Sequence, residues 1–298
     1  MKLPFALTGL LCASLLFTSP VSATELTGTL KKIQDTGSIT LGYRESSVPF
    51  SYLQSDGTPT GYAFEVCKAV SDAVKKELNM PNLTVKYQAV TSANRIPLIQ
   101  NGTVDIECGS TTNSKVRQRE AGFGTNYFGI QVTAAVWKDS GINSLKDLNG
   151  KNVAVTSGTT SVALLKKFEK EAGIKVRLLM TKDFAEAMQL VANKRAAAFV
   201  IDDVLLAGQI ANLANPQDFK IIDESLSTEP YAAMFAKDDP QFKALVDRTV
   251  TGMIADGRLP ALYKKWFESP IPPKGINLNF PMNSVTKELF ANPNSDGI

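Results

Sequence analysis

The stretch Ile106–Arg119, IECGSTTNSKVRQR, holds the residues best suited to bind a charged molecule. An apolar run passes into the small and hydroxyl-bearing residues Gly109 to Asn113, and Arg117 follows. The first N–H groups of a helix lack partners within the helix and carry partial positive charge, so they attract anions. A guanidinium group grips a carboxylate through two parallel hydrogen bonds. The stretch therefore predicts a helix start that binds a carboxylate; a capped helix with a solvent-exposed arginine is the alternative.

A second hydroxyl-rich loop, SGTTS at Ser157–Ser161, follows another apolar run and precedes another predicted helix. Such loops at the carboxyl ends of strands, one in each half of the chain, can face each other across a cleft. The loop lacks the spacing and the lysine of a phosphate-binding GxxxxGK[ST] motif. Asp202 and Asp203 follow the apolar run AAAFVI, where a carboxylate can pair with an ammonium group or simply cap a turn. A carboxylate grip and an ammonium partner together predict a receptor for an amino acid.

The composition excludes several other kinds of chemistry. The chain contains no histidine, which rules out Ser-His-Asp and Cys-His catalysis and leaves few ligands for zinc, so we expect neither a metal nor a cofactor. Catalysis by carboxylates or lysine stays open. With 32 basic and 29 acidic residues, the formal net charge is only +3, which does not favour binding to nucleic acid or to a membrane surface.

The first residues, MKLPFALTGLLCASLLFTSPVSA, predict a secretory signal peptide over residues 1–23. Its apolar run, Phe5 to Phe17, is too short to span a bilayer, and no other run is long enough, so we expect an exported protein without stable membrane insertion. Export leaves Cys67 and Cys108, and an even pair in an oxidising compartment favours a disulfide over two buried thiols. Such a bridge would close a loop of roughly 40 residues and contribute about 3–4 kcal/mol.

The elements expected to position these residues alternate between strands and helices, which is the pattern of an α/β protein with mostly parallel strands. The first half is expected to contain strands at 38–43, 83–90 and 104–108, and helices at 61–78 and 95–102. The second half is expected to contain strands at 132–137, 151–156, 175–180 and 196–203, and helices at 144–150, 160–173 and 184–195. Two further helices, split by Gly257, are expected within 239–267, and the Pro- and Asn-rich tail is expected to wrap a surface.

Seven stretches carry a family resemblance: GYRESSVPFSY, VTSANRIPLIQNG, ECGSTTNSKVRQ, VAVTSGTTS, IDDVLLAG, DDPQFK and SPIPPKGINLNF. With them the sequence resembles the periplasmic amino-acid-binding proteins that feed ABC importers, and most of all their glutamate- and aspartate-binding branch. The resemblance covers nearly the whole chain after the signal peptide. It implies the two-lobed type II periplasmic binding protein fold, with the ligand between the lobes. It also implies a periplasmic monomer that delivers an amino acid to an inner-membrane ABC permease.

The resemblance further implies where the lobes begin and end. After the signal peptide, residues 24–132 form the first part of lobe 1, and residues 133–233 form lobe 2. Residues 234–269 return to lobe 1, and residues 270–298 form a C-terminal extension.

The resemblance implies roles for the residues that would hold the α-groups of an amino acid. Arg117 holds the α-carboxylate, helped by Thr112 and Thr160. Asp202 pairs with the α-ammonium, helped by Ser110. These roles agree with the carboxylate grip and the ammonium partner expected from the residue types alone.

At the side-chain end of the ligand, the resemblance implies Arg44, Ser92 and Arg95. Two arginines there would balance the charge of a second carboxylate on the ligand, and they therefore favour glutamate or aspartate. One position departs from the branch, which carries a histidine where this chain has Phe184. Phenylalanine cannot donate a hydrogen bond to a carboxylate, so Phe184 is the position that we expect to affect specificity.

Other functions stay open at this point. If Phe184 marks a rebuilt pocket, the ligand is a neutral polar amino acid such as glutamine, or an acidic ligand with an apolar part. The chain is an enzyme, like the periplasmic dehydratases that resemble these receptors, if Glu45 or Glu107 serves as a general acid. Both carboxylates are more simply explained as loop and strand-end charges, and we expect a receptor without catalytic activity. A sensory role, in which the closed form docks on a signalling receptor, is open as well.

The same composition predicts how binding depends on pH. No side chain in the sequence has an ordinary pKa between those of the carboxylates and the thiols. We therefore expect the affinity for an acidic amino acid to be flat from about pH 6 to about pH 8.

Overall fold

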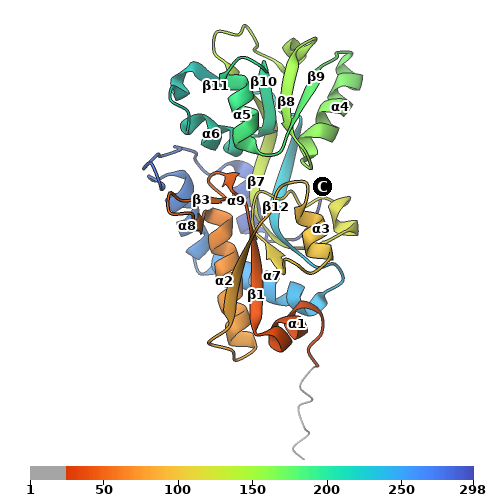
Figure 1. Cartoon of the computed structure of the whole chain (residues 1–298), viewed down its shortest axis with the longest axis vertical. Helices are drawn as coiled ribbons and strands as arrows, with labels where there is room; N and C mark the ends of the chain where they lie inside the picture. The colour runs from red at the N-terminus through yellow and green to blue at the C-terminus, as the bar shows by residue number, and fades with distance from the viewer. Residues whose placement is uncertain (1–24) are drawn as a thin grey trace, which may run out of the picture.

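Two long strands run side by side through both lobes of the protein in the computed structural model, which describes residues 25–298 (Figure 1). They are β7 (Gly122–Trp137) and β12 (Ser227–Phe235), and they pair in antiparallel fashion. The signal peptide expected at residues 1–23 lies outside the described residues. The lobe boundaries expected at 132/133 and 233/234 fall within these two strands, and they stay a prediction.

One continuous sheet links the lobes, in the order β5-β1-β6-β12-β7-β10-β8-β9, with β11 beside β7. The lower lobe of Figure 1, lobe 1, contains β1 (Ser38–Tyr43), β5 (Thr84–Ala89) and β6 (Ile106–Glu107). The upper lobe, lobe 2, contains β8 (Asn152–Thr156), β9 (Arg177–Thr181), β10 (Ala198–Asp202) and β11 (Phe219–Ile221). β1 is parallel to β5 and β6, and β8 is parallel to β9 and β10, as expected. The antiparallel pairs of this sheet all involve β7 or β12.

Helices cover the sheet in both lobes. Lobe 1 carries α1 (Gly28–Thr36), α2 (Tyr62–Glu77), α3 (Arg95–Gln100), α7 (Pro240–Ala255), α8 (Arg258–Phe267) and α9 (Ser284–Ala291). Lobe 2 carries α4 (Thr160–Ala172), α5 (Phe184–Ala192) and α6 (Asp203–Ala211). A small antiparallel sheet of β2 (Ser46–Ser47), β3 (Ser51–Leu53) and β4 (Pro59–Thr60) lies in lobe 1. The expected helix at 144–150 is a 3-10 turn, Leu145–Leu148.

The sequence pattern found most of these elements but not all. The strand expected at 132–137 is only the second half of β7, whose first half is buried on both faces and shows no alternation. α6 follows β10 without a loop, and its apolar residues lie on several faces, which hides the helical spacing. α1 and α9 were not expected either. α9 lies in the tail, where the Thr286 hydroxyl accepts a hydrogen bond of 3.0 Å from the N–H of Gly129 in β7.

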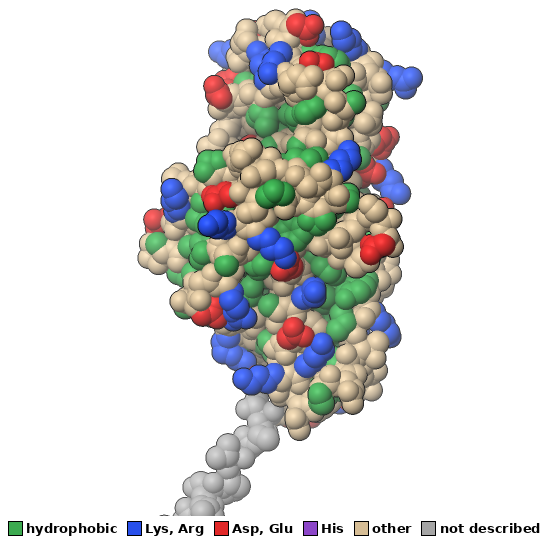
Figure 2. Space-filling model, turned by 90° about the vertical axis from the view of Figure 1, so that its left-hand side faces the viewer, with side chains coloured by type: hydrophobic (Ala, Val, Ile, Leu, Met, Phe, Trp, Pro, Cys, Tyr) green, Lys and Arg blue, Asp and Glu red, His purple; other side chains and the backbone are tan. Residues whose placement is uncertain are grey.

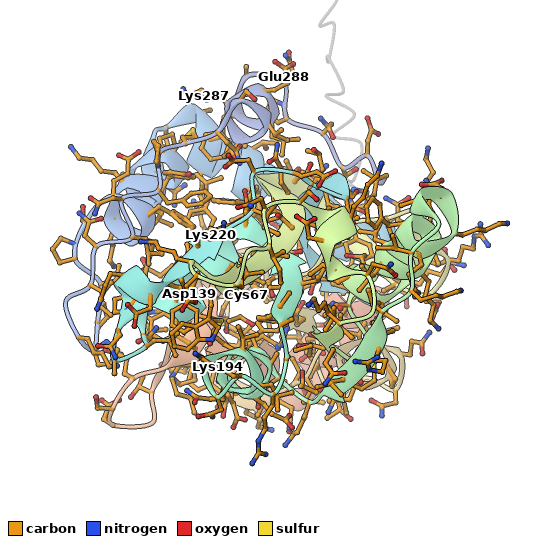
Figure 3. All side chains as sticks on the ribbon, turned by 90° about the horizontal axis from the view of Figure 1, so that it is seen from above. Cys67, Asp139, Lys194, Lys220, Lys287 and Glu288 are labelled. Atoms are coloured by element: carbon orange, nitrogen blue, oxygen red, sulfur yellow. A yellow bond between two sulfur atoms is a disulfide. The ribbon has the colours of Figure 1, made fainter. Side chains whose placement is uncertain are left out.

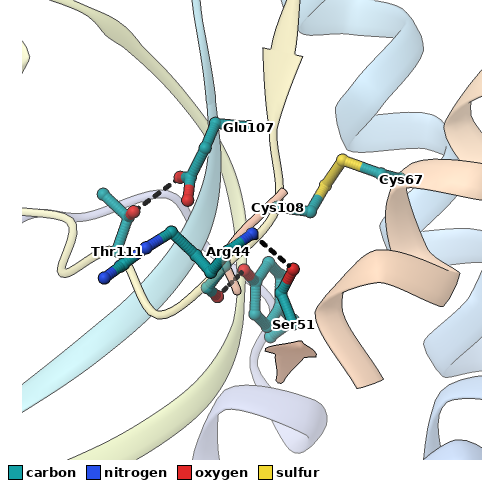
Figure 4. Close-up of a disulfide and its surroundings, with 8 residues drawn as sticks. Arg44, Ser51, Cys67, Glu107, Cys108 and Thr111 are labelled. Atoms are coloured by element: carbon teal, nitrogen blue, oxygen red, sulfur yellow. Dashed lines mark hydrogen bonds between the residues drawn. A yellow bond between two sulfur atoms is a disulfide. The ribbon is translucent and has the colours of Figure 1, made fainter. Parts of the chain in front are cut away.

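The expected disulfide between Cys67 and Cys108 is confirmed. Cys67 lies on the buried face of α2 and Cys108 directly follows β6, with their Cα atoms 5.7 Å apart (Figure 4). The bridge ties the start of the loop Gly109–Asn113 to the core of lobe 1. This loop is therefore held on its amino side by a covalent link.

The surface gives little sign of a large partner of one charge. On the face in Figure 2, basic and acidic side chains are interspersed over both lobes. Within residues 25–298, no helix combines the length and the apolar character needed to cross a membrane.

The two lobes touch each other along their shared boundary, beside α6. The side-chain amide of Gln209 in lobe 2 donates a 2.6 Å hydrogen bond to the carbonyl of Ser46 in lobe 1. The next residue back, Gly208, lies so close to the carbonyl and Cβ of Val48 that an added methyl group would overlap them. This structure is therefore a closed arrangement of the lobes.

Gly208→Ala is expected to oppose this closure. A methyl group against Val48 forces the lobes apart, so the affinity for glutamate or aspartate, the ligands that the resemblance implies, should weaken by about 1–3 kcal/mol in a calorimetric titration. Gly252→Ala in α7 is the matched control, because nothing lies within 4 Å of the added methyl group. It should leave the affinity unchanged and stabilise the fold by about 0.4–1 kcal/mol. Equal affinities for the two variants would contradict the closed contact.

Candidate functional site

The loop that carries Arg117 differs from the expected helix start. Between Asn113 and the start of β7, the only helical residues are a three-residue 3-10 turn, Arg117–Arg119. The free N–H groups expected at the start of an α-helix are therefore absent here. Val116 is 62% exposed, and it gives the loop no buried anchor. The second loop behaves as expected, since α4 begins at Thr160. The positive charge of the first loop therefore comes from the Arg117 side chain rather than from a helix dipole.

Three buried arginines converge where the lobes meet. Arg44 and Arg95 are each 2% exposed, and Arg117 is 9% exposed. In the described part of the chain, no carboxylate oxygen lies within 4.0 Å of their guanidinium nitrogens. Burial, and then the charge of neighbouring Arg95, lower the pKa of both Arg44 and Arg117 to about 10. At neutral pH Arg44 and Arg117 are therefore still charged, and an anion bound at this boundary would stabilise their charge.

Backbone and hydroxyl oxygens hold these guanidinium groups only in part. Arg117 donates to the carbonyl of Thr112 in its own loop at 3.0 Å and to that of Gly158 in lobe 2 at 3.0 Å. Arg95 donates to the Ser110 carbonyl at 3.2 Å and to the Thr111 hydroxyl at 2.6 Å. Arg44 has no hydrogen bond at Nη1, and its guanidinium carbon lies 4.9 Å from the ring centre of Phe184 across the lobe boundary.

A small cavity lies between the lobes, and most of the residues expected to form the site line it. Its lining contains Arg95, Ser110, Thr112, Arg117, Thr159, Thr160, Phe184, Ile201 and Asp202. Its volume is about 10 Å³, which leaves room for about one water molecule. An amino acid is larger, so it can enter only when the lobes separate.

Two expected site residues, Arg44 and Ser92, lie outside this lining. Arg44 is behind Phe184, against which its guanidinium packs. Ser92 is buried, its hydroxyl has no hydrogen-bond partner, and its carbonyl lies against Gly158 in lobe 2. Both residues are therefore next to the boundary, and the structure does not place them on the wall of the closed cavity.

Asp202 is a buried carboxylate at the end of β10. The hydroxyl of Tyr231 donates to its Oδ2, and its Oδ1 has no partner. Burial, and then the negative charge of Glu229, raise the pKa of Asp202 to about 8. The adjacent Asp203 is also raised, by burial, to a pKa of about 6, although backbone N–H groups of Val204 and Gln131 bond to it. A cation beside Oδ1 would relieve the electrostatic cost of an ionised Asp202.

Glu229 is a site residue that the sequence pattern did not reveal. It lies in β12 and is fully buried, and its Oε2 accepts hydrogen bonds from the hydroxyls of Thr112 at 2.6 Å and Thr160 at 2.9 Å. These threonines come from different lobes, so one carboxylate oxygen joins the two hydroxyl-rich loops. Glu229 stands in the polar stretch STEPYA with no motif around it, and only the pairing of β12 with β7 brings it here.

Glu107 is buried beside this site in lobe 1. Its Oε2 accepts a 2.6 Å hydrogen bond from the Thr111 hydroxyl (Figure 4). The same hydroxyl accepts a hydrogen bond from the Arg95 guanidinium. The three residues form a chain in which Thr111 separates the two charges. Glu107 therefore offsets part of the positive charge of Arg44 and Arg95 without forming a direct ion pair.

Unsatisfied polar atoms gather at the lobe boundary. Among the described residues, most of the buried side-chain nitrogens and oxygens without a hydrogen-bond partner belong to this cluster: Arg44 Nη1, Ser92 Oγ, Arg95 Nε, Glu107 Oε1, Asp202 Oδ1 and Glu229 Oε1. Buried polar groups are nearly always paired in folded proteins. Both donors and acceptors are left over here, which fits a ligand that carries negative and positive groups. The described residues contain no group of three or more side chains placed to hold a metal ion.

Comparison with known proteins agrees with this geometry. Residues 39–269 match the model of the bacterial extracellular solute-binding proteins, family 3. The chain belongs to this family. It is 46% identical over 291 residues to the L-glutamate/L-aspartate-binding protein of Pseudomonas aeruginosa, covering 97% of this chain and 96% of that protein. It is 43% identical over 270 residues to the glutamate/aspartate import solute-binding protein of Escherichia coli, covering 91% of this chain and 89% of that protein.

Among solved structures, the fold resembles that of an ancestral amino-acid-binding protein described as a precursor of cyclohexadienyl dehydratase. The TM-score is 0.69 at 31% identity, over 80% of this chain and 99% of that one. The family expected from the sequence motifs is thus confirmed, together with its two-lobed α/β fold.

The buried state of Asp202 changes the expected pH dependence of binding. Its pKa near 8 means that it holds a proton at neutral pH, and an ammonium group beside it favours the ionised form. Ligand binding below about pH 8 should therefore release a proton, and the affinity should rise with pH by at most about tenfold per unit, then level off. Calorimetry in buffers of different ionisation enthalpy measures the released proton directly.

Asp202→Asn should abolish the proton release and weaken binding. Asp203→Asn is the matched control, because the Asp203 carboxylate bonds to backbone N–H groups and does not line the cavity. A flat affinity and no proton release for the unmodified protein would restore the expectation drawn from the sequence alone.

Proposed function

We propose that this protein binds an amino acid with an acidic side chain, glutamate or aspartate, and delivers it to an importer. The observation that carries the proposal is the set of three buried guanidinium groups without a carboxylate partner, beside the buried carboxylate of Asp202. A ligand with two carboxylates and one ammonium supplies the missing charges. The names of the two curated relatives at 46% and 43% identity support the same ligands.

The α-carboxylate of the ligand is assigned to Arg117 and to two backbone N–H groups. The N–H groups of Thr112 and Thr160 donate to no acceptor within the described chain. The Thr160 N–H lies at the start of α4, where the helix leaves its first donors free. Arg117 already lies within hydrogen-bond reach of both loops. These groups come from both lobes, so binding a carboxylate between them favours closure.

Glu229 decides what the two threonine hydroxyls can do. A hydroxyl has one proton to donate, and both hydroxyls donate theirs to Glu229. They can then only accept from a ligand, which suits its ammonium group and not its carboxylate. The help that Thr112 and Thr160 give to the carboxylate is therefore assigned to their backbone and not to their side chains.

The α-ammonium is assigned to Asp202, with Ser110 beside it in the cavity lining. The side-chain carboxylate is assigned to Arg95 and Arg44, with Ser92 nearby. Arg44 lies behind Phe184 in the closed lobes, so the ligand is expected to reach Arg44 past the edge of the ring while the ring stays packed on the guanidinium. The Phe184 ring replaces a hydrogen-bond donor with an aromatic face that packs on Arg44.

We assign the protein to the periplasm and give it an inner-membrane ABC permease as partner. This rests on the signal peptide expected at residues 1–23 and on the import role in the name of the Escherichia coli relative. We further propose that the receptor is monomeric and has no catalytic turnover. The general-acid candidates Glu45 and Glu107 do not line the cavity, and Glu45 is exposed.

Calorimetry on protein that has been unfolded and refolded to remove bound ligand tests the proposal. Arg117→Ala should weaken glutamate or aspartate binding by about 2–5 kcal/mol, because the ligand carboxylate loses its buried partner. Arg119→Ala is the matched control, an exposed arginine in the same 3-10 turn, and it should bind like the parent. If the parent binds neither amino acid while it binds another, the ligand is wrong. If it converts prephenate or arogenate, the receptor function is wrong.

Phe184→Leu tests the aromatic contact on Arg44. Removing the ring takes away a cation–π contact, so the affinity for the acidic ligand should fall by about 0.5–2 kcal/mol. Phe199→Leu serves as the control, because this ring packs beside Phe184 within lobe 2 and is not part of the cavity lining. Titration of both variants with glutamate, aspartate and glutamine measures the effect. A gain in affinity for glutamine alone would show that Phe184 selects against neutral ligands.

A further inference from the structure

The end of the chain returns to the loop that carries Arg117. After α9, residues 294–298 run beside residues 113–118, and Figure 1 shows the chain end at the level of the lobe boundary. The N–H of Lys115 donates to the carbonyl of Ile298 at 2.9 Å, and the N–H of Ile298 donates to the carbonyl of Asn113 at 3.3 Å. These two hydrogen bonds join the backbones of the two segments.

Two side-chain amides strengthen this pairing. The side-chain amide of Asn113 donates to the backbone carbonyl of Ser295 at 3.0 Å. The side-chain oxygen of Asn113, Oδ1, accepts a hydrogen bond from the Gln118 side-chain amide at 2.8 Å. The Gln118 amide also donates to the carbonyl of Ser295, at 3.2 Å. Asn113 is fully buried, and its amide also donates to the side-chain oxygen of Asn126 at 3.0 Å, so the tail supplies the second acceptor of this buried amide. The tail therefore satisfies polar groups at both ends of the segment 113–118.

The tail is anchored independently of this loop. The side-chain amide of Asn283 donates to the Gly129 carbonyl in β7 at 2.7 Å, and Val285 packs so tightly on Gly129 that no side chain would fit there. Further along, the backbone of Asn126 in β7 donates to the carbonyl of Asn294 at 2.8 Å. The tail thus runs along a strand that passes through both lobes and ends against the Arg117 loop.

Residues 111–113 are already restrained by β12, because the Ala232 N–H donates to the Thr111 carbonyl at 3.2 Å and the Asn113 N–H donates to the Pro230 carbonyl at 2.9 Å. The following segment, residues 114–118, has few restraints of this kind. It contains no helix longer than the three-residue turn Arg117–Arg119, and Val116 points to solvent. The disulfide restrains only the amino side, at Cys108. Arg117 must nevertheless present a long side chain to Gly158 in the other lobe.

We propose that residues 294–298 are positioning residues of the ligand site, which hold the segment 113–118 and with it the Arg117 guanidinium in place for the carboxylate. The proposal rests on the proposed function of the site. It gives the C-terminal extension a role in affinity, although no tail residue lines the cavity.

Ending the chain after Pro293 tests the proposal. Glutamate or aspartate should bind about tenfold more weakly, the equivalent of one net hydrogen bond, because the loop is no longer held. Lys287→Ala is the matched control on the same extension, since Lys287 lies on the outer face of α9 (Figure 3), and its affinity should equal that of the parent. Gln118→Ala, which keeps the tail and removes one tie to it, should give a smaller loss of the same sign if the truncated chain does not fold.

A double-mutant cycle separates positioning from general stability. If the tail acts through Arg117, the truncation should cost much less affinity in an Arg117→Lys background than in the parent. Equal costs in both backgrounds, or an unchanged affinity after truncation, would overturn the proposal. Amide hydrogen exchange gives a readout that needs no ligand: residues 114–118 should exchange faster in the truncated chain. Should the parent bind neither acidic amino acid, the proposed ligand fails, and the exchange rates still decide on the tail.

Discussion

Burying a guanidinium group is costly unless negative charge or several acceptors surround it, and this protein buries three at one boundary. Carbonyl and hydroxyl oxygens hold Arg95 and Arg117 only in part, and Arg44 packs against an aromatic ring. The nearby carboxylates stay apart from them, because Thr111 separates Glu107 from Arg95. The remaining charge is best satisfied by a ligand with more than one carboxylate. The surrounding structure has to keep these groups close without letting them pair with one another.

The two crossing strands make this arrangement possible. β7 and β12 are the only elements of the described chain that run through both lobes, and Glu229 lies on one of them. The Glu229 carboxylate accepts one hydroxyl hydrogen bond from each lobe, so it joins the two hydroxyl-rich loops. Lobes that turn about these strands can open for a ligand and then close on it. The small size of the closed cavity makes such an opening necessary.

Restraints around the site hold the loop between Cys108 and Gln118, which carries Arg117, at both ends. The disulfide between Cys67 and Cys108 fixes its amino side to α2, and the tail fixes its carboxyl side. Between them the loop itself needs no regular secondary structure. The backbone N–H of Thr112 therefore stays free for a ligand, whereas a helix or a regular strand would have used it for its own hydrogen bonds.

The sequence by itself determined the elements with clear spacing and the residues with distinctive chemistry. The apolar period of α2, the break at Gly257 between α7 and α8, and the hydroxyl-rich loop before α4 are local patterns that no distant contact overrides. The pair of cysteines and the family motifs could also be recognised from the sequence alone. The helix expected at Arg117 was wrong. The segment makes only a few turn hydrogen bonds of its own, such as Gln118 N–H to the Ser114 carbonyl and Ala121 N–H to the Arg117 carbonyl, before β7 begins at Gly122.

Only the tertiary structure decided the parts that depend on residues far apart in the sequence. Glu229 reaches the site because β12 pairs with β7, and no pattern in the stretch STEPYA predicts a buried carboxylate. The pKa of Asp202 follows from burial and from Glu229, which its own neighbours in the sequence do not reveal. The position of the tail likewise depends on contacts with Gly129 and Asn113, more than a hundred residues away. Local patterns describe an element, whereas the charge balance of a closed site depends on how all the elements meet.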